Sequence, residues 1–570
     1  MPIDFSKKKA GLLVPVFALR RTDDLGIGDT QAVKETIDFC KGVGVGVLQL
    51  LPINETGGDN SPYNAVSALA LDPVYITMTP EQVPGLDPAH LAQIATPDVL
   101  GRVRPGPVNY SLVKPLKRKL LEAAYEGFLS GGDNQSRKAF DTFKNEHKDW
   151  LGDYSLFSLL LEIYQGDARW PQWHLNHVCS SATRKWIAAN KDKAALEKRA
   201  DFFAYVQWVA FTQWLEIRAY ADKNGVQLMG DIPFGVSRYS ADVWGNPKIF
   251  DLDWSGGAPP ETFFKCDPFT EKWGQNWGIP LYHWKENEAE DFAWWKKRVR
   301  LTCKVFNLFR IDHVLGFFRI YSFPWTPEKN GEFMNLTLEQ AKEKTGGLLP
   351  GFLQYPDEPV DLAVKNSIQG YRLLDKIKQF AAEEGVVAED LGVVPSYVKP
   401  ILEELAIPGF TIPIFVRDEE TREFLSPSDY PEKTLITFAT HDHPPMASYY
   451  ADIVARWKGP GGHEAWLDIE RLMRLLGLAL GREGQPPAEF NPLIHEAMMK
   501  LILDNHCWLA VFMITDLLGN TQRFNEPGLS ADSNWSQRLD FSLGELKAHP
   551  TYSAVVEQFA LMVKASGRAG

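Results

Sequence analysis

The chain has 570 residues, of which 45% are hydrophobic and 23% are charged, and its formal net charge is −13. These proportions are typical of a globular protein with a large buried core. The acidic balance excludes a nucleic-acid partner, because no basic face is available to bind phosphates, and no apolar run approaches the roughly 20 residues of a membrane-spanning helix.

Eight apolar runs recur along the chain, and helical patterns fill most of the intervals between them. Near-continuous apolar runs are typical of strands buried on both faces, and strands that alternate with helices form parallel sheets. The sequence therefore predicts an α/β fold, a (β/α)8 TIM barrel with a large helical insertion and extended active-site loops. The predicted strands are Leu12–Phe17, Val47–Ile53, Val226–Phe234, Val305–His313, Val386–Ala388, Phe410–Val416, Leu435–Ala439 and Leu509–Thr515.

Residues 76–200 break this alternation of strands and helices. They hold helical patterns joined by Pro-rich segments, and the predicted helix Phe202–Lys223 returns the chain to the barrel. We therefore expect three parts. Residues 1–75 form the first part of the catalytic barrel, residues 76–200 form an inserted helical subdomain, and residues 201–570 form the remainder of the barrel with its long loops.

The cysteines and the start of the chain indicate a cellular compartment. Five cysteines, odd in number, are scattered along the chain at Cys40, Cys179, Cys266, Cys303 and Cys507. This distribution favours reduced thiols over a disulfide framework. A lysine-rich segment followed by an apolar run resembles a short signal peptide, but Pro15 interrupts it and no small-residue cleavage site follows. We expect a cytoplasmic protein.

Acidic side chains stand at the C-terminal ends of four predicted strands: Asp231, Asp312, Glu389 and Asp442. In an α/β barrel these ends meet at one face, which is where such folds carry their chemistry. Arg310 is the natural counter-charge for Asp312, since a buried carboxylate without a partner is costly. A purely structural Arg–Asp pair at the end of a barrel strand is the alternative interpretation of this stretch.

Carboxyl groups that converge in this way support two kinds of chemistry. Close like charges raise one another's pKa, so that one carboxyl stays protonated as a general acid, and a pair about 5–5.5 Å apart suits retaining glycosidic chemistry. A metal-dependent hydrolase is an alternative, because His313, His441 and His443 accompany the acids. The first predicted strand holds no His, which disfavours that alternative, so no metal is predicted.

Several motifs, in this order, resemble those of one enzyme family. The strings RIDH, AEDLG and THD end at His313, Gly392 and Asp442. Together with the motifs given next, they resemble the 4-alpha-glucanotransferases (amylomaltases and disproportionating enzymes), a branch of the α-amylase superfamily. The other matching segments are Gly26–Asp29, Ser61–Tyr63, Gly230–Val236, Ser240–Pro247, Trp277–Trp284, Arg523–Gly528 and Asn534–Arg538.

The resemblance implies a role for each candidate residue. Asp312 is the expected nucleophile, Glu389 the acid/base, and Asp442 the residue that holds the sugar hydroxyls in the transition state. Six further residues are implied in substrate binding: Tyr63, Asp231, Trp277, Arg310, His313 and His441. Arg310 is expected to orient Asp312, and the two histidines to hydrogen-bond the sugar before the cleaved bond. Tyr63 and Trp277 could instead be ordinary loop-packing residues.

These expectations define a function and its rivals. We predict transfer of an α-1,4-glucan segment from a donor to the 4-hydroxyl of an acceptor, with maltodextrin, maltose, glucose or glycogen as substrates and no cofactor. An α-1,4-glucan hydrolase of the same clan and a non-catalytic glycan-binding barrel remain alternatives. His443 stands where the family usually has Asn, and the segment Lys265–Gln275 is longer than usual, so acceptor preference stays open.

Overall fold

The computed structural model describes residues 3–570 except 261–266, 419, 461, 481–483 and 528–532. At its centre is a parallel sheet of eight strands in the order β10-β11-β12-β1-β2-β3-β6-β9. The two end strands of this order, β9 and β10, also meet. The amide of Ala388 in β9 donates to the carbonyl oxygen of Pro408, the residue before β10, at 2.9 Å, so the sheet closes into a barrel. The strands are β1 (Lys9–Leu13), β2 (Val47–Gln49), β3 (Gln227–Ile232), β6 (Leu308–Ile311), β9 (Gly385–Ala388), β10 (Gly409–Thr411), β11 (Thr434–Thr437) and β12 (Leu509–Met513).

Each of the eight predicted apolar runs overlaps one barrel strand, so the predicted (β/α)8 fold is confirmed. Most strands end earlier than the apolar runs do. The run Leu12–Phe17 leaves the sheet after Leu13, because Pro15 has no N–H for the ladder and the chain turns into a short 3-10 helix at Val16–Ala18. Apolar residues beyond a strand end still face the core, so hydrophobicity alone overstates strand length.

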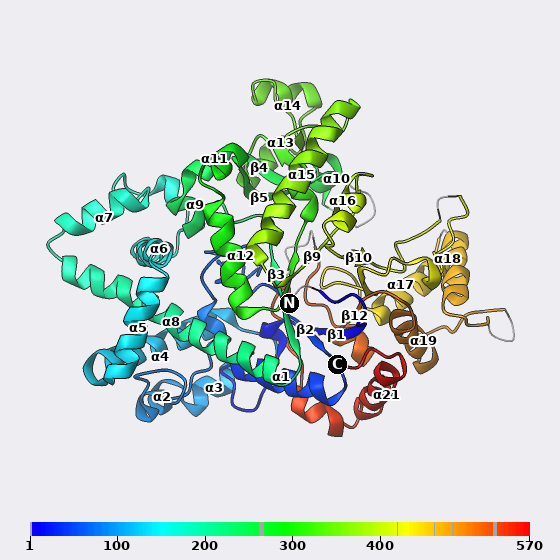
Figure 1. The fold of residues 1–570 in the computed structure, drawn as a ribbon, viewed down its shortest axis with the longest axis horizontal. Coiled ribbons are helices and arrows are strands. Elements are labelled where there is room, and N and C mark those ends of the chain that lie inside the picture. Colours follow the sequence, from blue (N-terminus) through cyan, green and yellow to red (C-terminus); the bar gives the residue numbers. More distant parts are fainter. Residues whose placement is uncertain (1–2, 261–266, 419, 461, 481–483, 528–532) are drawn as a thin grey trace.

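Helices cover the outside of the barrel (Figure 1). They are α1 (Thr30–Gly42), α8 (Lys193–Lys223), α11 (Trp284–Ala289), α12 (Ala293–Val305), α15 (Val360–Ala381), α16 (Val398–Glu404), α17 (Met446–Trp457), α18 (Gly462–Leu475), α19 (Pro492–Leu503), α20 (Ile514–Leu518) and α21 (Ser553–Ala565). The Asp29 carboxylate caps α1 by accepting from the Ala32 amide at 3.0 Å. α11 and α12 are separated at Asp291 and Phe292, which both have positive φ.

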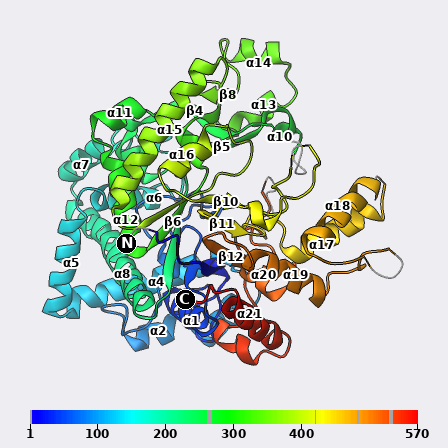
Figure 2. The ribbon, with the colours of Figure 1, turned by 45° about the vertical axis from the view of Figure 1, so that its right-hand side comes forward.

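Six helices lie between β2 and α8 and extend from one side of the barrel, opposite α17–α19 (Figures 1 and 2). They are α2 (Pro88–Ile94), α3 (Pro97–Val103), α4 (Tyr110–Gly131), α5 (Asn134–Glu146), α6 (Leu151–Ile163) and α7 (Ser180–Ala189). α8 begins at Lys193, nine residues before the predicted start at Phe202. Its first turns are mostly exposed and charged, so they lack the apolar pattern that marked the rest of the helix.

A second, antiparallel sheet has the order β5-β4-β7-β8. It consists of β4 (Phe250–Ala258), β5 (Gln275–Tyr282), β7 (Ile320–Phe323) and β8 (Gly351–Leu353), accompanied by α9 (Ala241–Gly245), α10 (Pro268–Trp273), α13 (Asn330–Phe333) and α14 (Leu338–Lys344). It packs on its own apolar cluster, which includes Trp273, Phe323, Trp325 and Phe333. This sheet was not predicted, because glycines and one proline interrupt the alternation of its strands.

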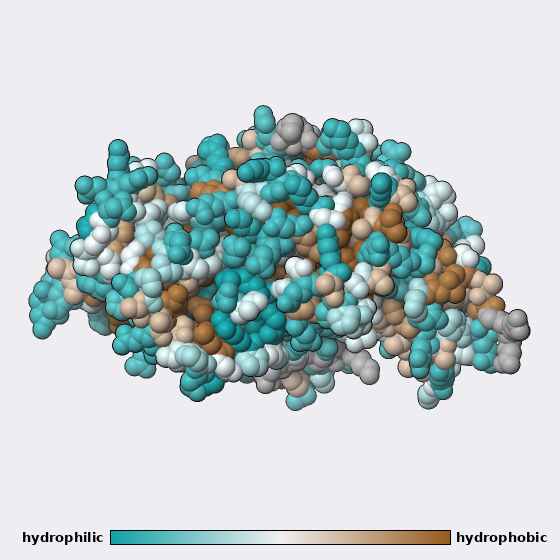
Figure 3. Space-filling view, turned by 90° about the horizontal axis from the view of Figure 1, so that it is seen from below, coloured by the Kyte–Doolittle hydropathy of each residue, from teal (hydrophilic) through white to brown (hydrophobic). Residues whose placement is uncertain are grey.

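The surface and the thiols complete the description. Figure 3 shows a mainly hydrophilic face, on which apolar residues form separate patches. In the described part of the chain, no helix combines the length and apolarity needed to cross a bilayer.

Four cysteines are free thiols, namely Cys40, Cys179, Cys303 and Cys507. Cys266 and Lys265 lie outside the described residues, as does Gly528.

Candidate active site

A cavity of about 540 Å³ opens where the C-terminal ends of the barrel strands meet. Eight of the nine candidate residues line it: Tyr63, Trp277, Arg310, Asp312, His313, Glu389, His441 and Asp442. The ninth, Asp231, is buried and in contact with Tyr63 and Arg310. The structure therefore brings together residues from six separate segments of the sequence. This convergence follows from the parallel barrel, which places all of these strand ends on the same face.

Arg310 joins two of the acidic residues. Its Nη1 donates to both carboxylate oxygens of Asp231, at 2.9 and 2.7 Å, and its Nη2 donates to Asp312 Oδ1 at 2.8 Å. Asp231 and Arg310 are register partners on β3 and β6, so the pairing is set by the sheet itself. The Arg310 side chain is 4% exposed and that of Asp312 is 28% exposed. The guanidinium is thus fully paired inside the protein, while Asp312 reaches the cavity.

Glu389 lies beside Asp312. Ile311, the last residue of β6, is the register partner of Ala388, the last residue of β9. Asp312 and Glu389 directly follow these two residues. Glu389 Oε2 accepts from the His313 amide at 2.8 Å, and Oε1 accepts from the Leu391 amide at 2.9 Å. Burial raises the pKa of Glu389 to about 7, with Arg310 opposing and Asp312 adding to the rise. The carboxyl can therefore take up and release a proton near neutral pH.

Asp442 is held from three directions. The Asn525 amide donates to Oδ1 at 2.6 Å, and His441 Nε2 lies 3.2 Å from Oδ2. Arg523 donates to the Asp442 backbone oxygen at 3.0 Å. Burial alone would raise the pKa of Asp442, but His441 and the Asn525 hydrogen bond outweigh it, so the pKa is lowered. Asp442 is therefore ionised at neutral pH and fixed in orientation.

Two aromatic residues occupy different depths of the cavity. The Tyr63 hydroxyl donates to Asp231 Oδ2 at 2.7 Å, and its ring stacks on His441 with centroids 5.1 Å apart. Trp277 is 39% exposed and meets the His313 ring edge-on, with centroids 4.9 Å apart. Tyr63 thus belongs to the polar network of the site, and Trp277 offers open aromatic surface at its rim.

Several residues that line this cavity were given no role from the sequence, among them Phe234, Gln275, Asn525 and Trp535. Asn525 and Trp535 lie in two segments that carried the family resemblance, Arg523–Gly528 and Asn534–Arg538, and those segments were the available signal. Their contacts depend on the loop after β12 folding back over the site. His443 also lines the cavity, and burial lowers its pKa to about 4.

The chemistry of this arrangement is that of a carboxyl pair. Asp312 is paired with a fixed cation, while its neighbour Glu389 binds a proton near neutral pH. Two carboxyls whose environments separate their proton affinities can divide the roles of nucleophile and acid. Among the described residues, no group of three or more His, Cys, Asp or Glu side chains is arranged to hold a metal ion.

Comparison with known proteins places the chain in a family. The 4-alpha-glucanotransferase family model matches residues 14–543. The 4-alpha-glucanotransferase of Chlamydia pneumoniae is 28% identical, with 96% of this chain and 95% of that protein covered, and the Aquifex aeolicus enzyme is 29% identical, with 93% and 95% covered. The amylomaltase of Streptococcus agalactiae, solved with acarbose, has a similar fold: the TM-score is 0.74, the identity is 21%, and 99% of this chain and 100% of that chain are covered. The chain therefore belongs to the 4-alpha-glucanotransferase family.

Proposed function

We propose that this enzyme transfers α-1,4-glucan segments by a retaining mechanism with a covalent glycosyl-Asp312 intermediate. The observation that carries this proposal is the pair of neighbouring carboxyls, Asp312 and Glu389, at the register-matched ends of β6 and β9. One is paired with Arg310 and the other has a pKa of about 7. Retaining chemistry needs both states at once, a carboxylate that attacks and a carboxylic acid that protonates.

In the first half-reaction, an Asp312 oxygen attacks the anomeric carbon of the donor. Arg310 engages Oδ1 and so fixes the carboxylate plane, and the exposed part of the side chain faces the cavity. Glu389 gives its proton to the glycosidic oxygen as the bond breaks, which removes the need to expel an alkoxide. The products are a glycosyl ester on Asp312 and a shortened sugar that leaves.

In the second half-reaction, the 4-hydroxyl of an acceptor attacks the same anomeric carbon. Glu389 is now ionised and takes the hydroxyl proton, which restores both carboxyls to their starting states. Two inversions at one carbon retain the α configuration. The two backbone amides that bind Glu389 hold it in place for both steps.

Asp442, His441 and His313 are proposed to hold the sugar that becomes attached to Asp312. Asp442 is ionised and immobilised by Asn525, so it can bind sugar hydroxyls without reorganising. Tyr63 supports this group because its ring stacks on His441 while its hydroxyl is held by a hydrogen bond to Asp231. Trp277 provides an open ring on which the acceptor sugar can stack, as sugar faces do on aromatic side chains.

The substrates, the division of the chain and the compartment complete the proposal. Maltodextrin, maltose, glucose and glycogen are the proposed substrates, and the exposed Trp277 ring on β5 is proposed to favour a sugar over water as acceptor. Residues 76–200 are proposed as an insertion in the barrel. The free thiols Cys40, Cys179, Cys303 and Cys507 fit a cytoplasmic protein.

The test is to incubate the enzyme with maltotriose, count reducing ends and resolve the products. Transfer conserves the number of reducing ends while it forms glucose and a ladder of longer chains. A count that rises in step with glucose, with no longer chains, would replace the proposal with the hydrolase alternative. Binding of maltotriose without any product, under conditions where a relative is active, would favour the glycan-binding barrel. An Asp312→Asn variant is the matched control for contaminating activity.

A further inference from the structure

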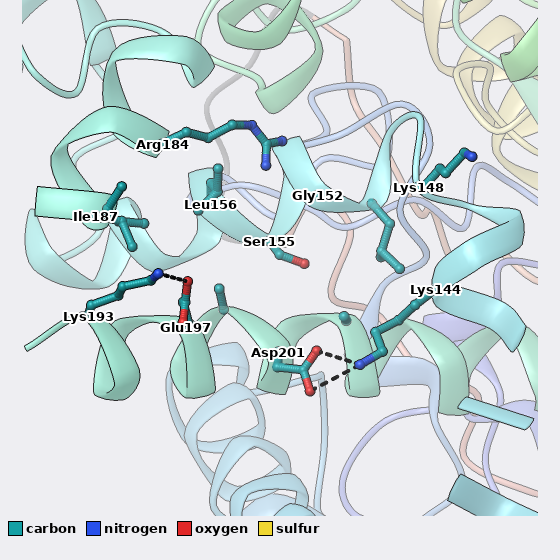
Figure 4. A pocket seen from close by; sticks show the side chains of 14 residues that line it. Lys144, Lys148, Gly152, Ser155, Leu156, Arg184, Ile187, Lys193, Glu197 and Asp201 are labelled. Atoms are coloured by element: carbon teal, nitrogen blue, oxygen red, sulfur yellow. Dashed lines mark hydrogen bonds and ion pairs between the residues drawn. The ribbon is translucent and has the colours of Figure 1, made fainter. Parts of the chain in front are cut away.

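A second cavity, of about 480 Å³, lies far from the barrel mouth, among helices α5, α6, α7 and α8 (Figure 4). Its rim is charged, with the cationic Lys144, Lys148, Arg184 and Lys193 and the anionic Glu197 and Asp201, and its walls are aliphatic. None of its lining residues belongs to the candidate active site. We propose that this cavity binds a phosphate monoester of a small organic molecule.

The side chains that line this cavity carry a net positive charge, opposite in sign to that of the protein. Four cationic and two anionic side chains line it, in a chain whose net charge is −13. The adjoining segment, residues 184–199, holds six Lys or Arg and only two acidic residues. A local cation excess in an acidic protein attracts small anions and disfavours cations.

Two of the four cations, Lys148 and Lys193, are loosely held, and the other two form closer ion pairs. Lys193 and Glu197 lie 3.7 Å apart and are 52% and 58% exposed, so this pair is weak. Lys144 contacts Asp201 at 3.1 Å, and Arg184 contacts Asp153, outside the cavity lining, at 2.6 Å. Among the described residues, Lys148 has no side-chain hydrogen-bond or ion-pair partner. Its ammonium points away from the cavity in Figure 4, and no ion pair prevents it from turning toward a ligand.

A buried hydroxyl also points to a ligand. Ser155 is 5% exposed, and its Oγ has no hydrogen-bond partner. In Figure 4 this oxygen points into the space between the helix that carries Ser155 and the helix that carries Asp201. A buried polar atom without a partner destabilises the fold, and a ligand oxygen that bonds to this hydroxyl would remove that cost.

The absence of a side chain at Gly152 keeps the upper edge open. A Cβ at this position would lie 3.1 Å from Arg184 Nη2, so the glycine lets the guanidinium reach across α6. Figure 4 shows Arg184 extending over Gly152 from α7. Donors therefore come from several different helices: Arg184 from α7, Ser155 from α6 and Lys193 from α8, with Lys144 at the end of α5.

The lining chemistry selects among ligand classes. No aromatic side chain is among the lining residues, all of which the structure describes, so a glucan would find no ring on which to stack. A phosphate carries about −1.5 to −2 charges at pH 7 and three acceptor oxygens, which suits several ammonium and guanidinium donors around one hydroxyl. Leu151, Leu156 and Ile187 supply apolar contacts to an attached carbon body.

The test is calorimetric titration of the full-length enzyme, in phosphate-free buffer, with glycerol 3-phosphate, inorganic phosphate and glycerol in separate arms. We expect saturable binding of the ester, weaker binding of phosphate and none of glycerol. Lys148→Glu should weaken ester binding at least tenfold. Lys185→Glu, the same charge change on an exposed α7 residue outside the cavity lining, should weaken it less than twofold. Transferase activity should be the same in both variants, because neither residue contacts the active site.

Three results would overturn the proposal. One is the absence of saturable binding of the ester; another is equal weakening by the two lysine variants, which would show a general charge effect. A third is displacement of the ester by maltotriose together with unchanged ester binding in Lys148→Glu, which would place the ester in the active site. Ser155→Ala guards against a folding artefact: without ligand its melting temperature should not fall, because the substitution removes an unsatisfied hydroxyl, and its ester affinity should fall several-fold.

Discussion

The proton affinity of Glu389 gives the sharpest test of the proposed mechanism. Its pKa is raised from 4.5 to about 7, first by burial and then by the nearby Asp312 charge, against the opposing effect of Arg310. At about 1.4 kcal/mol per pKa unit, the folded protein disfavours the ionised form by about 3 kcal/mol. Below pH 7 most molecules therefore carry the acid that the first half-reaction needs.

The assay is the pH dependence of kcat/KM for maltotriose, which reports on the free enzyme. The value should be level between about pH 5 and 6.5 and should fall tenfold per pH unit above about 7. Glu389→Gln should lose this limb and lower kcat/KM by roughly 10²–10⁴-fold. A donor with a good leaving group, such as α-glucosyl fluoride, needs no protonation, so wild-type kcat/KM for it should not show the limb.

The same shift predicts an effect on stability that does not depend on catalysis. A carboxyl whose folded pKa is raised contributes stability that is fully present below its unfolded pKa of 4.5 and is lost as the pH rises through about 7. Glu389→Gln should therefore be more stable than the wild type at pH 8, by up to about 3 kcal/mol, and the difference should be smaller at pH 5. Thermal unfolding at both pH values measures it. A fall in kcat/KM that begins near pH 4.5, together with equal stability of the wild type and Glu389→Gln at pH 8, would refute this account of Glu389.

Three further substitutions test other parts of the structure. Asp312→Asn should fold normally but lose several orders of magnitude in kcat, and mass spectrometry of a trapped intermediate should label Asp312 in the wild type; retained activity would move the nucleophile elsewhere. Asn525→Ala should lower kcat more than it raises KM, because it frees Asp442 Oδ1; an unchanged kcat would mean that Asn525 does not orient this acid. Asp24→Ala should destabilise the fold by about 3–5 kcal/mol in denaturant titration, because Arg538 is buried beside it; a change below 1 kcal/mol would show that solvent or other groups compensate.

The sequence alone determined the barrel and most of its chemical groups. Strands buried on both faces must be apolar along their length, so eight such runs were visible without any structure. A parallel barrel places all their C-terminal ends on one face, so acids that follow these runs had to converge. Asp231, Asp312, Glu389 and Asp442 were found in this way, and Arg310 was recognised as the partner of Asp312.

Contacts between distant segments were decided only by the tertiary structure. The bond from Asn525 to Asp442 spans 83 residues, and the double contact of Arg310 with Asp231 depends on the register of β3 against β6. The antiparallel sheet that carries Trp277 contains glycines and a proline that interrupt its alternation, so no local pattern announced it. The cavity among α5–α8 likewise has no signature along the chain. Local periodicity shows which face of an element is buried, but it does not show which other element covers that face. The positions of Asn525 and Lys148 depend on how distant elements pack against one another.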